Sequence, residues 1–327
     1  MTKYWQIAAG SVGRDYTSDF LRYGMAFVGG ERPCEAMGTV EIGDVVLLKR
    51  GLSELVAAGR VVARGGMHRG EGDKRWLHDF DGWNLKAWCY VDWCVPGKSV
   101  AVEGFTRNTI QQVRVPKLIE EAESVLEGVV AEFQPEPSPC RAISDEAMVE
   151  FLIGKGLRIA DAEDLTVTLR RIRRLANYYY EHEAGWEQIR EHETRTFLIV
   201  PLLLALGWPE QSIKIEQPVQ GGRVDLALFH APFDGKPEKA VALIETKGFT
   251  QGLSYAPGQA KGYTASFPEC KVIFVSNGYC YKAYERGAQG FPDVPSAYLN
   301  ILSPSDRYPI DPTVPGALKV LELLLRR

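Results

Sequence analysis

The sequence predicts a two-domain protein of the α+β or α/β class, in which a small β-barrel precedes a mixed sheet flanked by helices. Its 327 residues are enough for about two domains of ordinary size. Residues 4–115 consist of short apolar segments with strand character, separated by turns that contain glycine. After Pro116 the apolar residues recur at helical spacing, and strands and helices then follow in a pattern typical of a sheet covered by helices.

The composition is that of an ordinary globular chain, with 45% hydrophobic and 24% charged residues. No basic N-terminal region precedes an apolar stretch, and no apolar run is as long as a membrane span, so we expect a cytoplasmic protein without a membrane partner. The six cysteines form no CxxC pair and the five histidines complete no zinc-ligand spacing, which indicates reduced thiols. The net charge of −4 argues against a wholly basic nucleic-acid-binding protein but permits local basic surfaces.

The two domains are expected at 1–115 and 185–327, joined by a helical connector at 116–184. The clearest break in the chain is the Pro-rich stretch QPEPSPC at 134–140. One helix is expected before this break and another at 145–154, where Ser144 provides the N-terminal cap.

A further helix begins near Leu165, carries RRIRR and YYY, and is interrupted near Gly185. Four arginines within five positions can follow a phosphate backbone, although such a run is equally typical of a solvated helix face. The candidate DNA-binding residues are Arg170, Arg171 and Arg174, together with Tyr263 in a later segment.

The segment ALIETKGF at 242–249 places two charges in an otherwise apolar strand. Because strand side chains alternate between faces, Glu245 and Lys247 point to the same side. If the preceding strand pairs with this one as a hairpin, its Asp225 converges with Glu245. Two carboxylates and the carbonyl of Thr246 suit Mg²⁺, which can supply a hydroxide nucleophile and stabilise charge on a phosphodiester. Lys247 would position or deprotonate the attacking water; the alternative is an inert ion pair on an edge strand.

These residues resemble the signature of PD-(D/E)XK nucleases, in which an Asp precedes a Glu-x-Lys motif. Here the spacer between Asp225 and the Glu-Thr-Lys motif is nineteen residues, and Val224 stands where the signature has Pro. EHETRTFLIVPLLLALGW is similar to the opening helix of the nuclease domain of type I restriction enzyme motor subunits, with Glu191 four residues before Arg195. QAKGY at 259–263 resembles the Gln-xxx-Tyr element of that family, and VIFVSNGYCYKAY resembles its closing strand.

The resemblance covers about residues 185–300 and implies a set of roles. The implied catalytic residues are Glu191, Asp225, Glu245, Lys247 and Gln259. The implied cofactor is Mg²⁺, for which Mn²⁺ can substitute, with Asp225, Glu245 and Thr246 as ligands. The analogy with motor subunits ends there, because the GKS sequence at 97–99 has Asp92 where an ATP-binding loop needs its first Gly, so no ATP is expected.

The N-terminal segments YWQIAAGS, DYTSDFLRYGMAFVGG and GDVVLLKRG resemble a PUA-superfamily domain of the EVE or YTH-like type, over about residues 1–112. The middle segment reads as an aromatic-rich helix. The resemblance implies an aromatic pocket that holds a modified base by stacking and by hydrogen bonds to its edge. The candidate pocket residues are Trp5, Ser11, Tyr16, Trp83, Asp92 and Trp93. For any single Trp, a place in the barrel core is the alternative.

Together these features predict a modification-dependent DNA endonuclease that hydrolyses double-stranded DNA near a modified base. Because one active site cuts one strand, cleavage of both strands predicts a homodimer or a higher assembly. A non-catalytic reader of modified nucleic acid is the principal alternative, and a repair nuclease or RNA-directed nuclease with the same active site is another.

Overall fold

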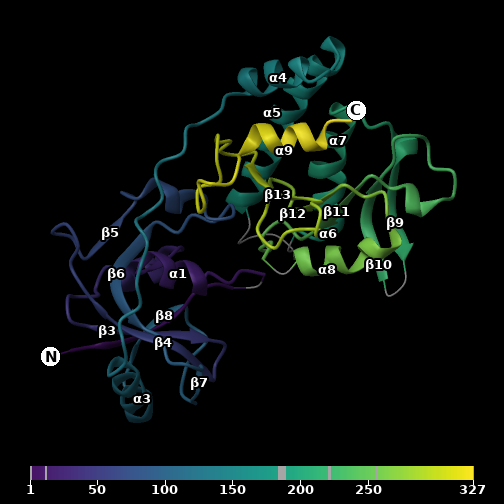
Figure 1. Cartoon of the computed structure of the whole chain (residues 1–327). Coiled ribbons are helices and arrows are strands. Elements are labelled where there is room, and N and C mark those ends of the chain that lie inside the picture. The colour runs from purple at the N-terminus through teal and green to yellow at the C-terminus, as the bar shows by residue number, and fades with distance from the viewer. Residues whose placement is uncertain (1, 12, 183–188, 220–221, 255, 327) are drawn as a thin grey trace. The chain divides into compact units, whose positions relative to one another are not determined.

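The computed structural model describes the chain except for residues 1, 12, 183–188, 220–221, 255 and 327 (Figure 1). It divides into two compact units, Met1–Pro137 and Ser138–Arg327. The division falls inside the Pro-rich stretch at 134–140. The chain is therefore a two-domain α+β protein, as the sequence predicts, and each unit is described by itself.

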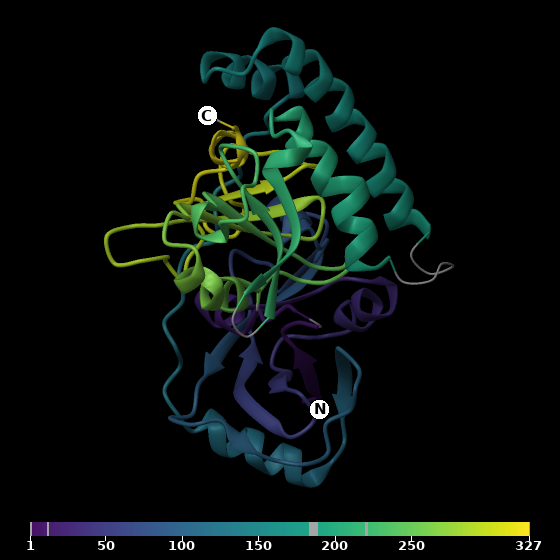
Figure 2. The same cartoon turned by 90° about the vertical axis from the view of Figure 1, so that its right-hand side faces the viewer.

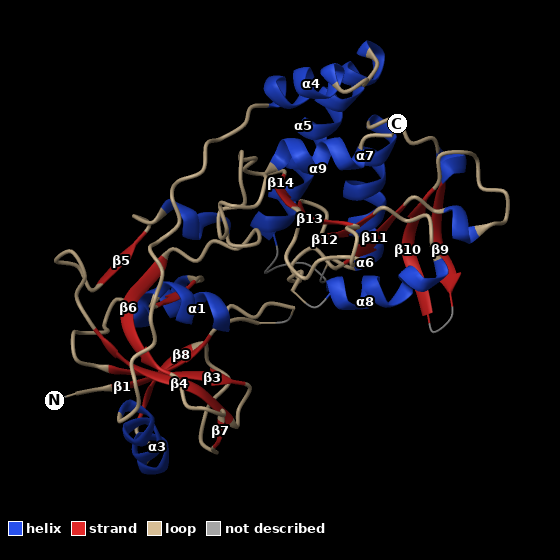
Figure 3. Ribbon diagram, viewed as in Figure 1, coloured by secondary structure: helices blue, strands red, loops and turns tan. Residues whose placement is uncertain are grey.

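The first unit is built on a sheet that curls into a half-barrel (Figure 3). Its central strand order is β2-β6-β4-β3-β1-β8, with β5 paired to β6 and β7 paired to β4. Strands β1 and β3 are parallel, and the other pairs are antiparallel. The strands are β1 (Tyr4–Ala8), β2 (Met25–Val28), β3 (Val45–Arg50), β4 (Glu54–Val61), β5 (Arg69–Glu71), β6 (Ala87–Cys94), β7 (Val100–Ala101) and β8 (Ile110–Val113).

Short helices complete the first unit: α1 (Thr17–Tyr23), α2 (Glu31–Met37), the 3-10 turn η1 (Arg75–Asp79) and α3 (Pro116–Leu126). The expectation that α3 belongs to a separate connector differs from the structure. Its buried residues Leu118, Ala122 and Val125 recur at helical spacing and pack into the same core as strand residues of the half-barrel. The helical connector expected at 116–184 is thus divided between the two units.

The helix expected over DYTSDFLRYGMAFVGG ends earlier than the sequence indicated. Gly24 adopts a left-handed conformation with φ of 58°, which closes α1 at Tyr23. The next four residues, Met25–Val28, are all buried and pair with β6 as strand β2. An apolar run with no polar position suits a strand covered on both faces better than a surface helix.

The second unit contains a six-stranded mixed sheet in the order β14-β13-β12-β11-β10-β9. Only β11 and β12 among these neighbours are parallel, and the other pairs are antiparallel. The strands are β9 (Ile213–Val219), β10 (Gly222–Leu228), β11 (Ala242–Thr246), β12 (Val272–Ser276), β13 (Cys280–Glu285) and β14 (Ala297–Asn300).

Helices flank this sheet, and α5 and α7 run side by side (Figure 2). The expected cap is confirmed, since Ser144 Oγ accepts the N–H of Ala147 at the start of α4. The longer helices are α4 (Asp145–Gly154), α5 (Ile159–His182), α8 (Ala256–Tyr263) and α9 (Ala317–Leu324). Short 3-10 turns are η3 (Glu210–Ser212), η4 (Pro237–Lys239) and η5 (Thr264–Ser266). The interruption expected near Gly185 lies outside the described residues.

The helix that leads into the sheet is continuous but irregular. It consists of α6 (Glu191–Thr194), a π-helical turn η2 (Arg195–Ile199) and α7 (Val200–Ala205). Pro201 has no N–H, so it cannot form the backbone hydrogen bond that a regular helix would require of it. The π-helical turn lies just before this position, where the regular helical pattern is already interrupted. Among the described residues, no helix combines the length and apolar character that crossing a membrane requires.

Candidate functional site

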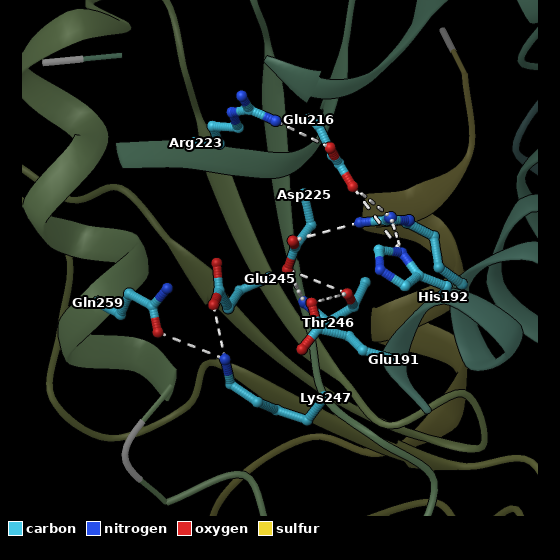
Figure 4. Close-up of polar contacts among 10 residues, drawn as sticks. Glu191, His192, Glu216, Arg223, Asp225, Glu245, Thr246, Lys247 and Gln259 are labelled. Atoms are coloured by element: carbon cyan, nitrogen blue, oxygen red, sulfur yellow. Dashed lines mark hydrogen bonds and ion pairs between the residues drawn. The ribbon is translucent and has the colours of Figure 1, made fainter. Parts of the chain in front are cut away.

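The hairpin of β10 and β11 brings the first two predicted carboxylates together. These strands are antiparallel, with Leu228 opposite Ala242 and Leu226 opposite Ile244. One step further along the same register, Asp225 stands opposite Glu245. The predicted hairpin is therefore confirmed, and Figure 4 shows both carboxylates at the same end of the sheet.

Lys247 completes a short polar chain beside them. Its Nζ donates to Glu245 Oε1 at 2.7 Å and to Gln259 Oε1 at 3.3 Å, so Glu245 and Lys247 do share one side as expected. Gln259 comes from α8, which packs against β11 and β12. The amide of Gln259 and the carboxylate of Glu245 therefore hold the ammonium group between them (Figure 4).

Burying the carboxylate of Glu245 at this position costs free energy. Glu245 is 3% exposed, and burial raises its pKa to about 7, helped by the charges of Asp225 and Glu191 and opposed by Lys247. A carboxyl group with this pKa can gain or lose a proton near neutral pH. One ammonium partner does not offset the loss of water and the two neighbouring anions.

Glu191 supplies a third carboxylate from α6. Its Oε1 accepts a hydrogen bond from the Thr246 hydroxyl at 3.2 Å, and Asp225 Oδ2 accepts from the same hydroxyl at 3.0 Å. Burial raises the pKa of Glu191, and the charge of Asp225 raises it further. Glu193, a second glutamate of this helix, is used differently, because its carboxylate accepts the N–H of Arg190 at the start of the helix.

Asp225 is held by contacts on both of its oxygens. Oδ2 also accepts the N–H of Thr246 at 2.7 Å, and Oδ1 accepts from the guanidinium of Arg195 at 3.3 Å. Thr246 was expected to offer its carbonyl to a metal. In the structure its N–H and hydroxyl reach the cluster, and both donate to Asp225.

The carboxylate cluster fits a divalent cation in its chemistry. Its donors are hard oxygens, and two of its three carboxyl groups have raised pKa values in part because they repel one another. Within the described parts of the chain, no three His, Cys, Asp or Glu side chains are gathered as a ready metal site. Mg²⁺ nevertheless needs only one or two protein carboxylates, since water and phosphate oxygens fill its other positions. Asp225 and Glu245 are the pair that would hold it.

A turn between β12 and β13 fixes the helix that carries Glu191. Gly278 in this turn has φ of 96°, and a Cβ at this position would lie 2.6 Å from Leu198 and 2.8 Å from Thr194. Only glycine lets the turn approach η2 this closely. The position of Glu191 above the sheet therefore depends on a residue that has no side chain.

The arginine cluster of α5 separates into two kinds of residue. Arg173 is structural, because its guanidinium donates to both oxygens of Asp145 at 2.5 and 2.6 Å and to the carbonyl of Ile301. The three predicted DNA-binding arginines are exposed, and none of them forms an ion pair with another described residue: Arg170, Arg171 and Arg174. The side chain of Tyr263 lies outside the described part of the structure.

Several residues expected in the base pocket lie in the core of the first unit. Trp5 is 6% exposed and its indole N–H donates to Asp44, whereas Trp93 is 1% exposed and donates to the carbonyl of Met25. Because a buried indole needs an internal acceptor, these contacts mark both as packing residues. Asp92 is also committed elsewhere, to an ion pair of 2.8 Å with Arg64. Sequence alone could not show which strands would cover these side chains.

Two of the predicted pocket residues do come together. The rings of Tyr16 and Trp83 are 6.1 Å apart, and the guanidinium of Arg14 lies 4.7 Å from the Trp83 ring centre. Tyr16 is buried and donates to the carbonyl of Phe80, while Trp83 is half-buried and Ser11 is exposed. Trp83 is thus the one tryptophan of the predicted set that reaches the surface.

No family model and no curated protein matches the chain. A crystal structure of a protein from Agrobacterium tumefaciens is similar over 38% of this chain and 93% of its own length, with 15% sequence identity and a TM-score of 0.25. Neither the identity nor the TM-score is high enough to establish a shared fold.

Proposed function

We propose that this protein is a Mg²⁺-dependent endonuclease of the PD-(D/E)XK type that cleaves DNA near a modified base. The observation that carries the proposal is the crowding of Glu191, Asp225 and Glu245, from three different elements, beside Lys247. Burial and the charges of neighbouring carboxylates raise the pKa of both Glu191 and Glu245. Such an arrangement is expected where a cation and a phosphate complete the site.

In this proposal each side chain has a distinct task in hydrolysis. When bound between Asp225 and Glu245, Mg²⁺ would activate water and stabilise charge on the phosphate. Lys247, fixed by Glu245 and Gln259, would orient the attacking water and offset the charge that builds on the phosphate oxygens. Glu245 would be ionised as a ligand of the cation, because a bound cation opposes the upward shift that burial produces in its pKa.

The remaining candidate contacts divide into recognition of the base and of the backbone. Trp83 is half-buried beside Arg14 and Tyr16, and a flipped base would stack on the part of its ring that reaches the surface. On α5, the exposed Arg170, Arg171 and Arg174 would contact phosphates without regard to sequence. Cleavage of both strands would require two copies of the chain.

The test is digestion of otherwise identical duplexes that carry cytosine, methylcytosine, hydroxymethylcytosine or glucosylated bases, with Mg²⁺ present. We expect cleavage of at least one modified duplex and none by Glu191→Gln or Glu245→Gln. Glu193→Gln is the matched control, because it alters a glutamate of the same helix that serves as a cap. Binding without cleavage by the unaltered protein would favour the non-catalytic reader instead.

A further inference from the structure

A buried arginine joins the carboxylate cluster to the neighbouring strand. The side chain of Arg195 is 5% exposed, and its Nη1 lies 3.3 Å from Asp225 Oδ1. Its Nη2 lies 3.0 Å from Glu216 Oε1 and 2.7 Å from Nδ1 of His192. The guanidinium therefore has two carboxylate partners, Asp225 on β10 and Glu216 on β9, both of which are labelled in Figure 4.

Glu216 occupies a backbone position that few residues with a side chain adopt. Its φ is 52°, one of two positive values at non-glycine residues in the described chain. In the β9–β10 register it falls between the pairs Val224–Gln217 and Leu226–Ile215, directly across from Asp225. Strain of this kind persists where the surrounding structure needs it, and functional sites are where it gathers.

Glu216 is the second carboxylate partner of Arg195, and its negative charge affects how strongly Arg195 neutralises Asp225. If Arg195 had Asp225 as its only anionic partner, its full positive charge would neutralise that carboxylate and weaken the attraction of Asp225 for a cation. Glu216 takes a share of the guanidinium, and its second oxygen is held by the exposed Arg223 at 3.2 Å. A planar guanidinium with fixed donors in two directions can hold both carboxylates at once.

We propose that Arg195 and Glu216 are positioning residues for the cation site: Arg195 orients Asp225, and Glu216 keeps Arg195 from neutralising it. This inference rests on the proposed function, since it assigns residues that prepare Asp225 for Mg²⁺. In this inference neither residue is assigned a contact with the substrate. Arg195 acts through Asp225, and Glu216 acts through Arg195.

Arg195 and Glu216, which together position Asp225, are called the clamp below. Two measurements on the full-length protein test it. Titration calorimetry with Mg²⁺ alone reports binding without any DNA, and a cleavage assay over a range of Mg²⁺ concentrations reports activity. We expect Glu216→Gln to weaken Mg²⁺ binding about ten-fold or more, with cleavage largely recovered at high Mg²⁺. Arg195→Lys keeps the charge but loses the planar fork, so we expect about ten-fold slower cleavage that excess Mg²⁺ does not restore.

The matched control is Arg223→Gln, which removes the outer partner of Glu216 but leaves the contact between Glu216 and Arg195. It should bind Mg²⁺ within about two-fold of the unaltered protein. Glu216 is a half-exposed residue of the edge strand β9, so its variant remains informative if Arg195→Lys does not fold.

The outcomes separate this inference from the proposed function. Equal Mg²⁺ affinities for Glu216→Gln and the unaltered protein would overturn the clamp even if the protein cleaves DNA. Weaker Mg²⁺ binding by Glu216→Gln in a protein that cleaves no DNA would support the clamp and reject the nuclease. An unaltered protein that binds no Mg²⁺ would overturn both.

Discussion

Each unit of the molecule contains a glutamate that is paired with a lysine, and the pKa values of the two glutamates are shifted in opposite directions. In the first unit, Glu136 accepts hydrogen bonds from Lys74, Tyr90 and Trp76. Burial would raise its pKa, but these donors outweigh burial and hold the pKa below its usual value. In the second unit, burial raises the pKa of Glu245 to about 7 despite the contact with Lys247.

The difference lies in what else surrounds each carboxylate. Three donors converge on Glu136, and Lys74 lies over the ring of Trp88 at 4.1 Å. Glu245 has one close donor, and two further carboxylates lie near it. A saturated carboxylate stabilises a fold, whereas a crowded one is retained at a cost in stability. The comparison therefore distinguishes a carboxylate whose donors outweigh burial from one whose donors do not.

The largest expected effect is on activity. Glu245→Gln should reduce cleavage about 1,000-fold or more, because loss of a cation ligand removes several kcal/mol of transition-state stabilisation. Glu136→Gln should leave the cleavage rate of the folded protein within a few-fold. Initial rates on a modified duplex at saturating Mg²⁺ measure both. Substantial cleavage by Glu245→Gln would end the assignment of this site.

For the free energy of unfolding, we expect the larger effect from Glu136→Gln and the smaller one from Glu245→Gln. Glu136→Gln should lower the free energy of unfolding by about 2 to 3 kcal/mol, since it leaves the ammonium of Lys74 buried without its anion. Glu245→Gln should leave stability unchanged or raise it in the absence of Mg²⁺, because a negative charge leaves the crowded cluster. Urea denaturation at pH 7 with EDTA measures the change. A loss of stability as large as that of Glu136→Gln would erase the proposed distinction.

The two networks should also respond to pH in opposite directions. The folded pKa of Glu245 lies above its unfolded value, so its stabilising contribution is complete below about pH 4.5 and is lost as pH rises through about 7. The folded pKa of Glu136 lies below its unfolded value, so its contribution is present above about pH 4.5 and is lost as pH falls further. One proton contributes a slope of at most about 1.4 kcal/mol per pH unit.

Denaturation from about pH 3 to about pH 8 should resolve these slopes. Glu245→Gln should flatten the fall in stability between about pH 4.5 and about pH 7, and Glu136→Gln should flatten the change below about pH 4.5. Mg²⁺ competes with protons for the cluster, so it should stabilise the unaltered protein near pH 8 by about 2.7 kcal/mol at 100 times its dissociation constant. It should not do so for Glu245→Gln. Slopes that persist in both variants would assign the pH dependence to other groups.

Helix α5 also carries both an ion-paired arginine, Arg173, and exposed arginines that pair with no other described residue. We expect the smallest effects from these residues. Replacing Arg170, Arg171 and Arg174 with Ala should weaken DNA binding equally for modified and plain duplexes and reduce the salt slope by about 2 to 3. The fold should be unaffected. Arg173→Ala should instead destabilise the second unit, because it removes both hydrogen bonds to Asp145. Binding isotherms at several salt concentrations and thermal melts separate the two results.

The structural features that could be predicted from the sequence are those formed by residues close together in the chain. The Ser144 cap and the pairing of β10 with β11 depend on residues close together in the chain, and both were found. The donors to Glu136 come from residues 46 to 62 positions away, so nothing near Glu136 in the sequence announces them. Trp5 and Trp93 were misplaced for the same reason, because strand order in the folded sheet decides which indoles are covered.

If the protein is the proposed nuclease, the close approach at Gly278 makes its activity sensitive to a position that carries no chemical group. One added methyl group at that position would push against Leu198 and Thr194 and should shift the helix that bears Glu191. A genetic selection for chains that are expressed at normal levels but no longer cleave DNA should therefore return substitutions of Gly278 beside those of the carboxylates. These variants would lose activity although glycine has no side chain that could take part in catalysis.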